Sequence, residues 1–384
     1  MKENKANSKH PLTQSAGSPE RPLTQSAGTS APPRGAFAPR VLLAGKLTAL
    51  DAPGGGEVQM LATAAALPSV GVCGRLWRPW EDALDEADCL HLFGSLPEHL
   101  PVVEAARRRN IPVVLSPIAW FALADCWRRP GRLDGRLAAC GRFLARSACP
   151  RLPSWRRRLY RAVDLLLPNS HAEATQLARY FQVPFKRMQI VPNGADERFA
   201  TADPEPFVEL AGVRDFVLCA GRIEPRKNQL GLLEAIRGTG VPVVVLGDVV
   251  PGFGWYLDAC RRAAGPEVRF ISRLEHDDPR LTAAYAACGC LVLPGWFETP
   301  GLAALEAGMS GTPLVLPKGG CAAEYFGPLA RYVSPNDPPG ICRAVLSALS
   351  SGRNQELAEL VGNNFSWHTA ARTTREAYEK VLWE

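Results

Sequence analysis

The chain has 384 residues, 46% hydrophobic and 21% charged, which is typical of globular protein, and its length suggests about two domains. It contains no run of the roughly 18 apolar residues that a membrane-spanning helix needs, and no early apolar stretch resembles a signal peptide, so we expect a cytosolic protein. The net charge is +6, but residues 128–161 hold eleven Arg, no Lys and one acid, Asp134, which favours contact with an anionic partner.

Residues 1–38 differ in composition from the rest of the chain. They are rich in Ser, Pro, Thr, Gln and Gly, and the segment PLTQSAG occurs at 11–17 and again at 22–28. A segment of this kind cannot bury enough apolar surface to offset the entropy lost on ordering. The sequence therefore predicts a disordered tail.

From residue 39 onward, strand-like runs alternate with segments of helical periodicity. Helices are expected near 57–67 and 99–109, and from a cap at Asn169-Ser170 to about Phe181. The predicted strands span 40–45, 88–93, 112–116 and 163–170 in the first half, and 216–221, 241–247, 268–272, 290–295 and 312–317 in the second. This alternation predicts an α/β fold with two doubly wound, Rossmann-like domains, residues 39–195 and 196–364.

The last segment, residues 365–384, has helical periodicity, with Phe365, Ala370, Ala377 and Val381 available for one face. We expect this C-terminal helix to pack back on the N-terminal domain. Because open α/β sheets bind ligands beyond the carboxyl ends of their strands, the two domains are expected to face one ligand across a cleft.

The segment GWFETPGLAALEAGMSG places two glutamates on either side of a predicted helix start. Thr299 suits the N-cap, Pro300 suits the first helical position, and Gly301 permits close backbone approach. The free N–H groups and positive dipole of a helix start favour a phosphate. Glu298 on the loop and Glu306 in the second turn can accept hydrogen bonds from sugar hydroxyls, the alternative being two ordinary solvated carboxylates.

Two further segments suit an anionic ligand. Arg222 and Lys227 follow the strand at 216–221, where fixed cations can stabilise a departing diphosphate without a metal. The glycines of GGGEVQ, residues 54–59, precede a helix and can approach phosphate or sugar. This segment lies too far after its strand for a dinucleotide fingerprint, which argues against a nicotinamide enzyme.

Metal-site candidates are weak. Cys288-Gly-Cys290 has no second Cys or His pair at ligand spacing, and the scattered cysteines indicate reduced core residues. The acid pair Asp277-Asp278 precedes Pro279 and fits a helix cap better than a metal site. We therefore predict no metal and no cofactor.

Four motifs together closely resemble the group 1 (family four) glycosyltransferases: PNSHAEA at 168–174, VPNGADERF at 191–199, GRIEPRKN at 221–228 and ETPGLAALEAG at 298–308. The resemblance covers about residues 40–384. It implies the GT-B fold, a nucleotide-diphosphate sugar donor held mainly by the C-terminal lobe, and an acceptor held mainly by the N-terminal lobe. It also implies transfer with retention at the anomeric carbon and no metal dependence.

Carried over residue by residue, the resemblance implies that Arg222 and Lys227 hold the donor diphosphate. Glu306 would hold the ribose hydroxyls and Glu298 the transferred sugar. Catalysis is expected to depend on Glu298, Arg222 and Lys227. Further donor contacts are expected from Gly55, Gly56, Arg273, Leu274, Thr299, Gly301 and Leu302.

The chain departs from the family pattern at two places. Many members have Glu-Gly-Phe-Gly where this chain has Glu298-Thr-Pro-Gly301, so Pro300 removes one possible phosphate-binding N–H. Many members also place a histidine after the strand at 112–116, where this chain continues Pro117-Ile118. His91, at the end of its strand, is a weak substitute expected to point toward the cleft, the alternative being a satisfied strand-end histidine.

The function predicted from these observations is transfer of a sugar to a glycan, lipid-linked or small-molecule acceptor. The alternatives are a catalytically silent nucleotide-sugar-binding protein, or a nucleotide-sugar epimerase or glycan phosphorylase of the same fold. The Arg-rich residues 128–161 indicate either a solvated helix face or peripheral contact with an anionic membrane at its inner, cytoplasmic face. No motif indicates nucleic acid.

Overall fold

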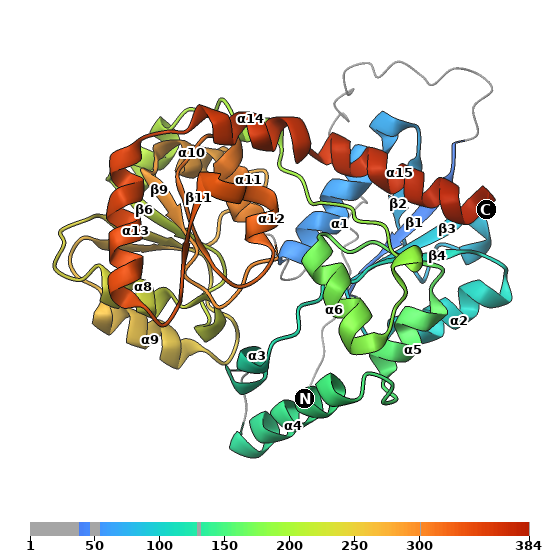
Figure 1. Cartoon of the computed structure of the whole chain (residues 1–384). Coiled ribbons are helices and arrows are strands. Elements are labelled where there is room, and N and C mark those ends of the chain that lie inside the picture. Colours follow the sequence, from blue (N-terminus) through green and yellow to red (C-terminus); the bar gives the residue numbers. More distant parts are fainter. Residues whose placement is uncertain (1–37, 47–53, 129–131, 300, 384) are drawn as a thin grey trace, which may run out of the picture. The chain divides into compact units, whose positions relative to one another are not determined.

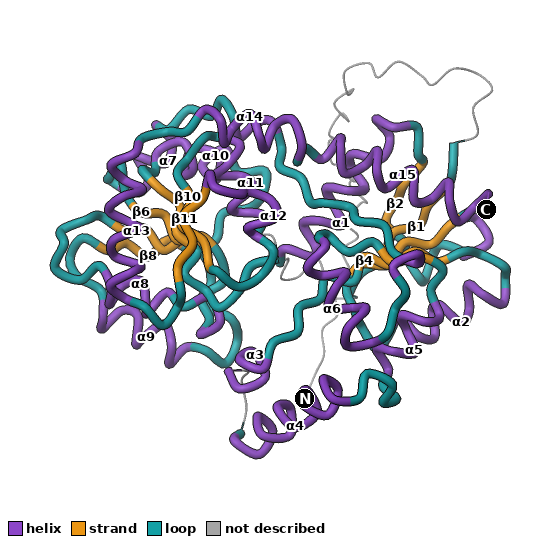
Figure 2. The backbone as a smooth tube through the Cα atoms, in the orientation of Figure 1, coloured by secondary structure: helices purple, strands orange, loops and turns teal. Residues whose placement is uncertain are grey.

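The computed structural model describes residues 38–46, 54–128, 132–299 and 301–383 (Figure 1). Apart from its last residue, the tail predicted for 1–38 lies outside the described residues. The described chain contains two parallel sheets, one in each half of the sequence, with helices around each (Figure 2). This arrangement confirms the predicted pair of Rossmann-like sheets, whereas the domain boundaries stay predictions.

The first sheet has five parallel strands in the order β2-β1-β3-β4-β5. The strands predicted at 40–45, 88–93 and 112–116 are confirmed, but the run at 163–170 forms a strand of only two residues. Pro168 lacks the N–H for a ladder bond, and the cap of the next helix follows at once. The strands are β1 (Arg40–Ala44), β2 (Cys73–Leu76), β3 (Cys89–Phe93), β4 (Val113–Ser116) and β5 (Leu165–Leu166).

The second sheet has six parallel strands in the order β11-β10-β9-β6-β7-β8. All five predicted strands are present, and the edge strand β11 was missed because it is short and contains Arg331, which interrupts the apolar run. The strands are β6 (Val217–Ala220), β7 (Val243–Leu246), β8 (Val268–Ile271), β9 (Cys290–Val292), β10 (Leu314–Pro317) and β11 (Ala330–Val333).

In the central strands of each sheet, both faces are buried. In β6, Val217 and Cys219 pack into one apolar cluster, and Leu218 and Ala220 pack into another on the opposite face. Successive side chains of a strand point to opposite faces, so a strand covered on both sides is a continuous apolar run. Polar side chains for a site are therefore found at the strand ends and in the loops that follow.

The helices begin and end largely where the sequence predicts. Ser170 accepts a hydrogen bond from the Glu173 N–H at 3.1 Å, and Asp278 accepts one from the Arg280 N–H at 2.8 Å, so both predicted caps are confirmed. The helices of the described residues are α1 (Gly55–Ala66), α2 (His99–Arg108), α3 (Leu123–Arg128), α4 (Leu133–Ala148), α5 (Trp155–Ala162), α6 (His171–Phe181), α7 (Glu205–Ala211), α8 (Gln229–Ala235), α9 (Gly254–Ala263), α10 (Pro279–Ala287), α11 (Leu302–Met309), α12 (Ala322–Phe326), α13 (Pro338–Ser351), α14 (Gln355–Asn364) and α15 (Trp367–Trp383).

The C-terminal helix α15 packs on the N-terminal sheet, as predicted (Figure 1). Its Ala377 and Tyr378 are fully buried in a cluster with Val41 and Leu43 of β1. Phe365 lies before the helix and packs in the C-terminal core instead, where its ring is 4.7 Å from that of Tyr325. The predicted face is therefore correct for Ala377 and wrong for Phe365.

Helix α12 contacts the N-terminal half through two consecutive residues. The Glu324 carboxylate accepts hydrogen bonds from the first N–H groups of α6, at 2.8 Å from His171 and 2.7 Å from Ala172. The Tyr325 hydroxyl donates to the carbonyl of Asn169 at 2.5 Å. Because the first N–H groups of a helix have no partner within it, this carboxylate satisfies them from the other half of the chain.

None of the helices in the described ranges combines the length and the apolar character that crossing a bilayer would take.

Candidate active site

Glu298 lies on the loop after β9 and is held by the loop after β10. Its N–H donates to the Gly319 carbonyl at 3.2 Å, and its carbonyl accepts from the Cys321 N–H at 3.0 Å. Gly320 between them has φ +104°, and a methyl group on it would lie 1.9 Å from the Glu298 carbonyl oxygen. Only glycine fits this crossing, so the backbone of Glu298 is firmly positioned.

The Glu298 side chain is almost fully buried and pairs with Lys227. One carboxylate oxygen lies 2.5 Å from the Lys227 Nζ, with the two side chains 5% and 18% exposed. A buried carboxylate is tolerated only when it is paired and hydrogen-bonded. The ammonium has three donors and uses one here, which leaves capacity for a ligand.

The predicted cation pair is divided between two environments. Lys227 is the last residue of a short 3₁₀ turn and forms an ion pair with Glu298. The Arg222 side chain is 57% exposed, and its distance of 3.4 Å from Glu224 makes a weaker pair. Glu224 also pairs with Arg226 at 2.9 Å. A methyl group on Gly54 would lie 3.8 Å from an Arg222 nitrogen, so Arg222 is next to the glycine segment of the N-terminal half.

Helix α11 starts between the two glutamates, as predicted, but the residue predicted to cap it, Thr299, is wrong. The N-cap is Gly301, with φ +84°, and the first helical residue is Leu302, so Thr299 does not cap the helix. Pro300 lies outside the described residues. The N–H groups of Ala304 and Leu305 bond the Gly301 carbonyl, so those of Leu302 and Ala303 have no acceptor within the helix.

Glu306 in the second turn of α11 is not a solvated carboxylate, because it is 7% exposed. Its Oε2 accepts a hydrogen bond from the Tyr285 hydroxyl at 2.7 Å, and its Oε1 lies 3.8 Å from His276 Nδ1. Burial raises the pKa of Glu306 to about 7, against the smaller opposing effect of the Tyr285 hydrogen bond. Tyr285 thus fixes one oxygen, and the other lies near His276 without a hydrogen bond from the described residues.

Arg273 and Leu274 follow β8, at the same edge of the sheet. The Arg273 N–H donates to Asp248 at 3.2 Å, and its guanidinium pairs with Glu275. Leu274 is half-buried against the C-terminal core.

Gly55 and Gly56 form the first turn of α1, capped by Gly54, whose N–H donates to Glu57 at 2.8 Å. Gly55 has open space around it, whereas a methyl group on Gly56 would lie 3.3 Å from the side chain of Ile118. The glycine segment therefore lies next to Ile118, in the loop after β4.

Ile118 has φ +47°, a left-handed conformation that is unusual for a β-branched residue. The next N–H, of Ala119, donates to the Glu173 carboxylate at 2.6 Å, and the Asn169 N–H donates to its other oxygen at 2.8 Å. Burial raises the pKa of Glu173 to about 7. Glu173 was missed by the sequence analysis, although the spacing Ser170-x-x-Glu173 is that of a capping box.

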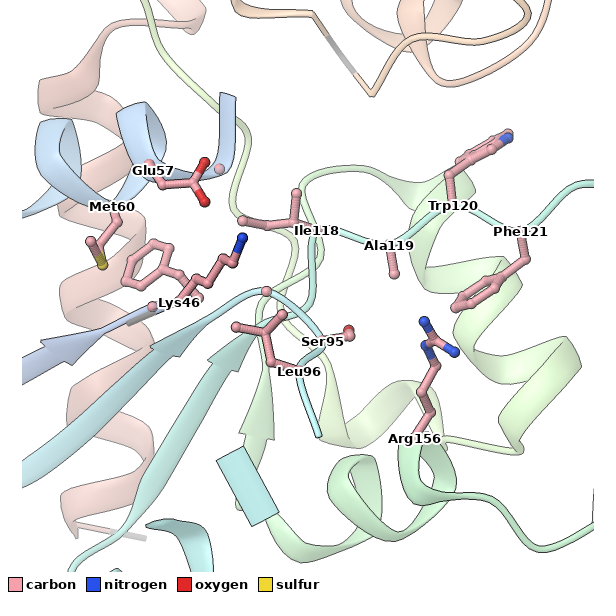
Figure 3. A pocket seen from close by; sticks show the side chains of 14 residues that line it. Lys46, Glu57, Met60, Ser95, Leu96, Ile118, Ala119, Trp120, Phe121 and Arg156 are labelled. Atoms are coloured by element: carbon pink, nitrogen blue, oxygen red, sulfur yellow. The ribbon is translucent and has the colours of Figure 1, made fainter. Parts of the chain in front are cut away.

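A cavity of about 300 Å³ opens beside Ile118 (Figure 3). Trp120, Phe121 and Arg156 lie on one side of it, and Lys46 and Glu57 lie on the other. The Trp120 ring stacks on Phe297, the residue before Glu298, at 5.8 Å. Of its lining residues, the sequence analysis covered Gly56 and Glu57 in GGGEVQ, Ile118 after the strand at 112–116, and Arg156 in the Arg-rich residues 128–161. It assigned no role to the other lining residues.

His91 does not face this site, and its expected direction is wrong. It is 1% exposed, with Nδ1 2.7 Å from the Tyr378 hydroxyl of α15 and Nε2 2.9 Å from the Ser116 hydroxyl. Burial lowers its pKa to about 3, so the ring is neutral. The alternative of a satisfied strand histidine is the correct one.

In the described part of the chain, no three His, Cys, Asp or Glu side chains gather closely enough to hold a metal ion.

Comparison with known proteins gives two family matches. Residues 205–365 match the model of glycosyl transferases group 1, and residues 64–199 match that of Glycosyltransferase Family 4. Glycogen synthase of Mycobacterium tuberculosis is 26% identical over 318 residues, which cover 79% of this chain and 69% of that protein. D-inositol 3-phosphate glycosyltransferase 2 of Catenulispora acidiphila is 30% identical over 247 residues, covering 58% and 57%.

Among solved structures, sucrose-phosphate synthase from Thermosynechococcus elongatus superposes with a TM-score of 0.70 at 16% identity, over 89% of this chain and 99% of that chain. This likeness shows the GT-B fold. With both halves matched by the two family models, the chain belongs to the group 1 glycosyltransferases, a retaining and generally metal-independent family that transfers sugars from nucleotide-sugar donors.

Proposed function

We propose that the donor binds at the carboxyl edge of the C-terminal sheet, with its ribose on Glu306. The observation that carries this proposal is that Glu306 is buried, fixed through one oxygen by Tyr285, and left with the other oxygen for a ligand. A carboxylate in such a position accepts hydrogen bonds from vicinal hydroxyls. Arg273, Leu274 and Thr299 are proposed as further donor contacts.

The donor diphosphate is proposed to lie against Arg222, Lys227 and the N–H groups at Gly301 and Leu302. Lys227 reaches it while keeping its bond to Glu298, because the ammonium has two donors to spare. Glu298 is proposed to hold the transferred sugar. Gly55 and Gly56 would cover the sugar-phosphate from the N-terminal half, which the proximity of Gly54 to Arg222 supports.

In the proposed reaction, the bond between the anomeric carbon and the donor phosphate oxygen breaks as the acceptor oxygen attacks the same face. The sugar passes through an oxocarbenium-like state, and the acceptor proton goes to the departing diphosphate. Arg222, Lys227 and the helix start stabilise the charge that builds on that leaving group, an effect typically worth about 3 kcal/mol per donor.

The acceptor is proposed to enter the cavity beside Ile118, because this cavity adjoins the glycine segment and, through Trp120 and Phe297, the Glu298 loop. A glycan, a lipid-linked sugar or a small molecule would each fit this reaction. The aromatic rings of Trp120 and Phe121 suit the apolar face of a sugar.

Peripheral contact of a cytoplasmic protein with the inner face of an anionic membrane is proposed through residues 128–161. On α4, Leu133, Leu137 and Leu144 are 59%, 54% and 54% exposed, and their spacing of four and seven puts them on one face. Exposed leucines beside arginines suit the boundary of an anionic bilayer. Sedimentation with phosphatidylglycerol vesicles at low salt tests this, and binding equal to that on neutral vesicles would contradict it.

The donor assignment is tested by a thermal-shift panel of UDP-, GDP-, ADP- and TDP-sugars. We expect one donor to raise the melting temperature of the wild type and of the control Glu209→Gln, an exposed change on α7, but not that of Glu306→Gln. An equal shift in Glu306→Gln would show that the ribose binds elsewhere.

A second candidate is a nucleotide-sugar-binding protein without turnover. The strained Ile118 in place of the family histidine favours it. Incubation of the best donor with the protein decides between the two, because slow hydrolysis to nucleotide diphosphate supports the enzyme, and tight binding with no hydrolysis or transfer supports the silent protein.

A further inference from the structure

A second cavity, of about 360 Å³, lies where α2 packs against α5, and four arginines line it together with Glu104 and four uncharged residues. Arg107 comes from α2, and Arg157, Arg158 and Arg161 come from α5. The residues that line it are all different from those of the cavity in Figure 3. Helix α5 serves both, because Arg156 lines the first cavity and its successors line the second.

The charge of this second cavity is largely uncompensated. Its one acid, Glu104, has an oxygen 3.7 Å from Arg158, and both side chains are exposed, so the pair is weak. Among the described residues, no hydrogen bond or ion pair is found for the side chains of Arg107, Arg157 and Arg161. The Arg157 Nε is buried and lacks any acceptor there.

Two more arginines, Arg146 and Arg187, lie close enough to the cavity arginines for their charges to interact. Burial and then the charge of Arg157 lower the pKa of Arg146, whose guanidinium donates to backbone carbonyls. Burial lowers the pKa of Arg187 as well, and Arg161 and Arg107 add to the decrease, while Asp164 opposes it. These arginines are satisfied by carbonyl groups, which accept hydrogen bonds but neutralise no charge.

The arginines at the start of α5 are placed unfavourably for helix stability. The first turn of α5 contains no acid and is occupied by Trp155, Arg156 and Arg157, although the N-terminus of a helix favours negative charge. Helix capping is supplied by Ser154, which accepts from the Arg157 N–H at 3.2 Å. Arg157 opposes the dipole of α5, whereas Arg161 and Arg107 lie in the last turns of α5 and α2, where positive charge is favourable. An anion bound between these side chains would relieve their mutual repulsion and the unfavourable position of Arg157.

We propose that this cavity binds a phosphate group through Arg157 and Arg161, with Arg107 completing the site from α2. Arginine suits this ligand because its planar guanidinium donates two parallel hydrogen bonds to phosphate oxygens. Such a phosphate can belong to a phospholipid headgroup or to a soluble phosphate ester. Phosphate binding at this site does not depend on the proposed membrane contact. Only the identification of the phosphate as a phospholipid headgroup rests on that contact.

Hydrogen exchange with inorganic phosphate tests the site directly, because it reports where protection occurs. We expect phosphate to slow exchange in α2 and α5 of the wild type. R157Q/R161Q should need at least about tenfold more phosphate for the same protection, since at least two charge-assisted bonds are lost. R108Q/R142Q removes the same charge from exposed positions outside both cavities and should behave as the wild type.

Vesicles then identify the source. If phosphatidylglycerol vesicles protect the same helices in the wild type but not in R157Q/R161Q, the headgroup is the ligand; if only inorganic phosphate does so, the ligand is soluble. No protection of α2 and α5 by phosphate, or equal protection in R157Q/R161Q, would overturn the proposal. The single variant R161Q, at an exposed position, repeats the test without risk to folding. Donor-induced thermal shifts should be unchanged in all three variants, so failure of this site is distinct from failure of the donor assignment.

Discussion

At the scale of single residues, Glu306 is a carboxylate that burial makes hard to ionise. Its pKa rises from 4.5 to about 7, because desolvation outweighs the Tyr285 hydrogen bond. An acid whose pKa is raised on folding contributes stability that is fully present below the unfolded pKa and is lost as the pH rises through the folded pKa. In the free protein, burial therefore disfavours the ionised form of Glu306, and the Tyr285 hydrogen bond and the charge of Arg198 offset this only in part.

Glu306→Gln removes this ionisation while keeping an acceptor for the Tyr285 hydroxyl. We expect the variant to match the wild type in unfolding free energy near pH 4 and to exceed it near pH 8 by roughly 1 to 3 kcal/mol. Urea unfolding at both pH values measures this. The exposed Glu209→Gln should change little at either, and a loss of stability in Glu306→Gln at high pH would contradict the account.

The same pKa predicts how donor binding depends on pH. If only the ionised Glu306 accepts both ribose hydroxyls, donor affinity should fall as the pH drops below about 7. In the limit the fall is about tenfold per pH unit, set by the fraction ionised. Calorimetric titration of the best donor measures it, with the exposed Glu209→Gln as the control that should keep the wild-type dependence. A wild-type affinity that is flat from about pH 8 to pH 5 would exclude the ionised form as the acceptor.

At the scale of elements, the site depends on loops that cross closely at the strand ends. The loop after β9 was predicted correctly, but the helix cap was predicted at Thr299 instead of Gly301. Both residue types are common at helix starts, and the residue types alone do not show that Gly301 adopts a positive φ. It missed Tyr285, Glu173 and Gly320, whose partners lie 21 to 54 residues away or are backbone atoms. The sequence therefore predicts motifs that lie within one segment, but it does not show which distant segments come into contact in the fold.

Gly320→Ala tests the loop crossing. A methyl group there meets the Glu298 carbonyl and also requires a left-handed φ, so we expect a loss of several kcal/mol in stability or a displaced loop, with donor hydrolysis reduced at least tenfold. Gly352→Ala is the matched control, since Gly352 has φ +65° but open space around it. Thermal unfolding and hydrolysis assays compare the two, and equal effects would show that the crossing does not matter.

At the scale of the whole molecule, helix α15 packs on the N-terminal sheet through a shared apolar cluster. The direction of His91 could not be predicted, because the face of β3 that it occupies is covered by α15, which comes 287 residues later at Tyr378. The two sheets and the return of the helix were predictable, since apolar periodicity extends over long segments. The hydrogen bond between His91 and the Tyr378 hydroxyl gives His91 a role in holding α15 on the sheet.

Tyr378→Phe tests this role, because it removes the hydroxyl and leaves a buried His91 nitrogen without its partner. We expect stability to fall by about 1 to 3 kcal/mol and donor hydrolysis to stay unchanged. Urea unfolding and hydrolysis rates provide the two readings. Lost turnover with unchanged stability would instead return His91 to a catalytic role.

The central claim is that a nucleotide sugar places its diphosphate against Arg222, Lys227 and the start of α11. The most direct measurement is a crystal structure of the protein with the donor that the thermal-shift panel selects. We predict diphosphate oxygens within about 3.5 Å of both basic side chains and of the Leu302 N–H, with the ribose on Glu306. A diphosphate bound anywhere else in a structure with an ordered donor would contradict the account.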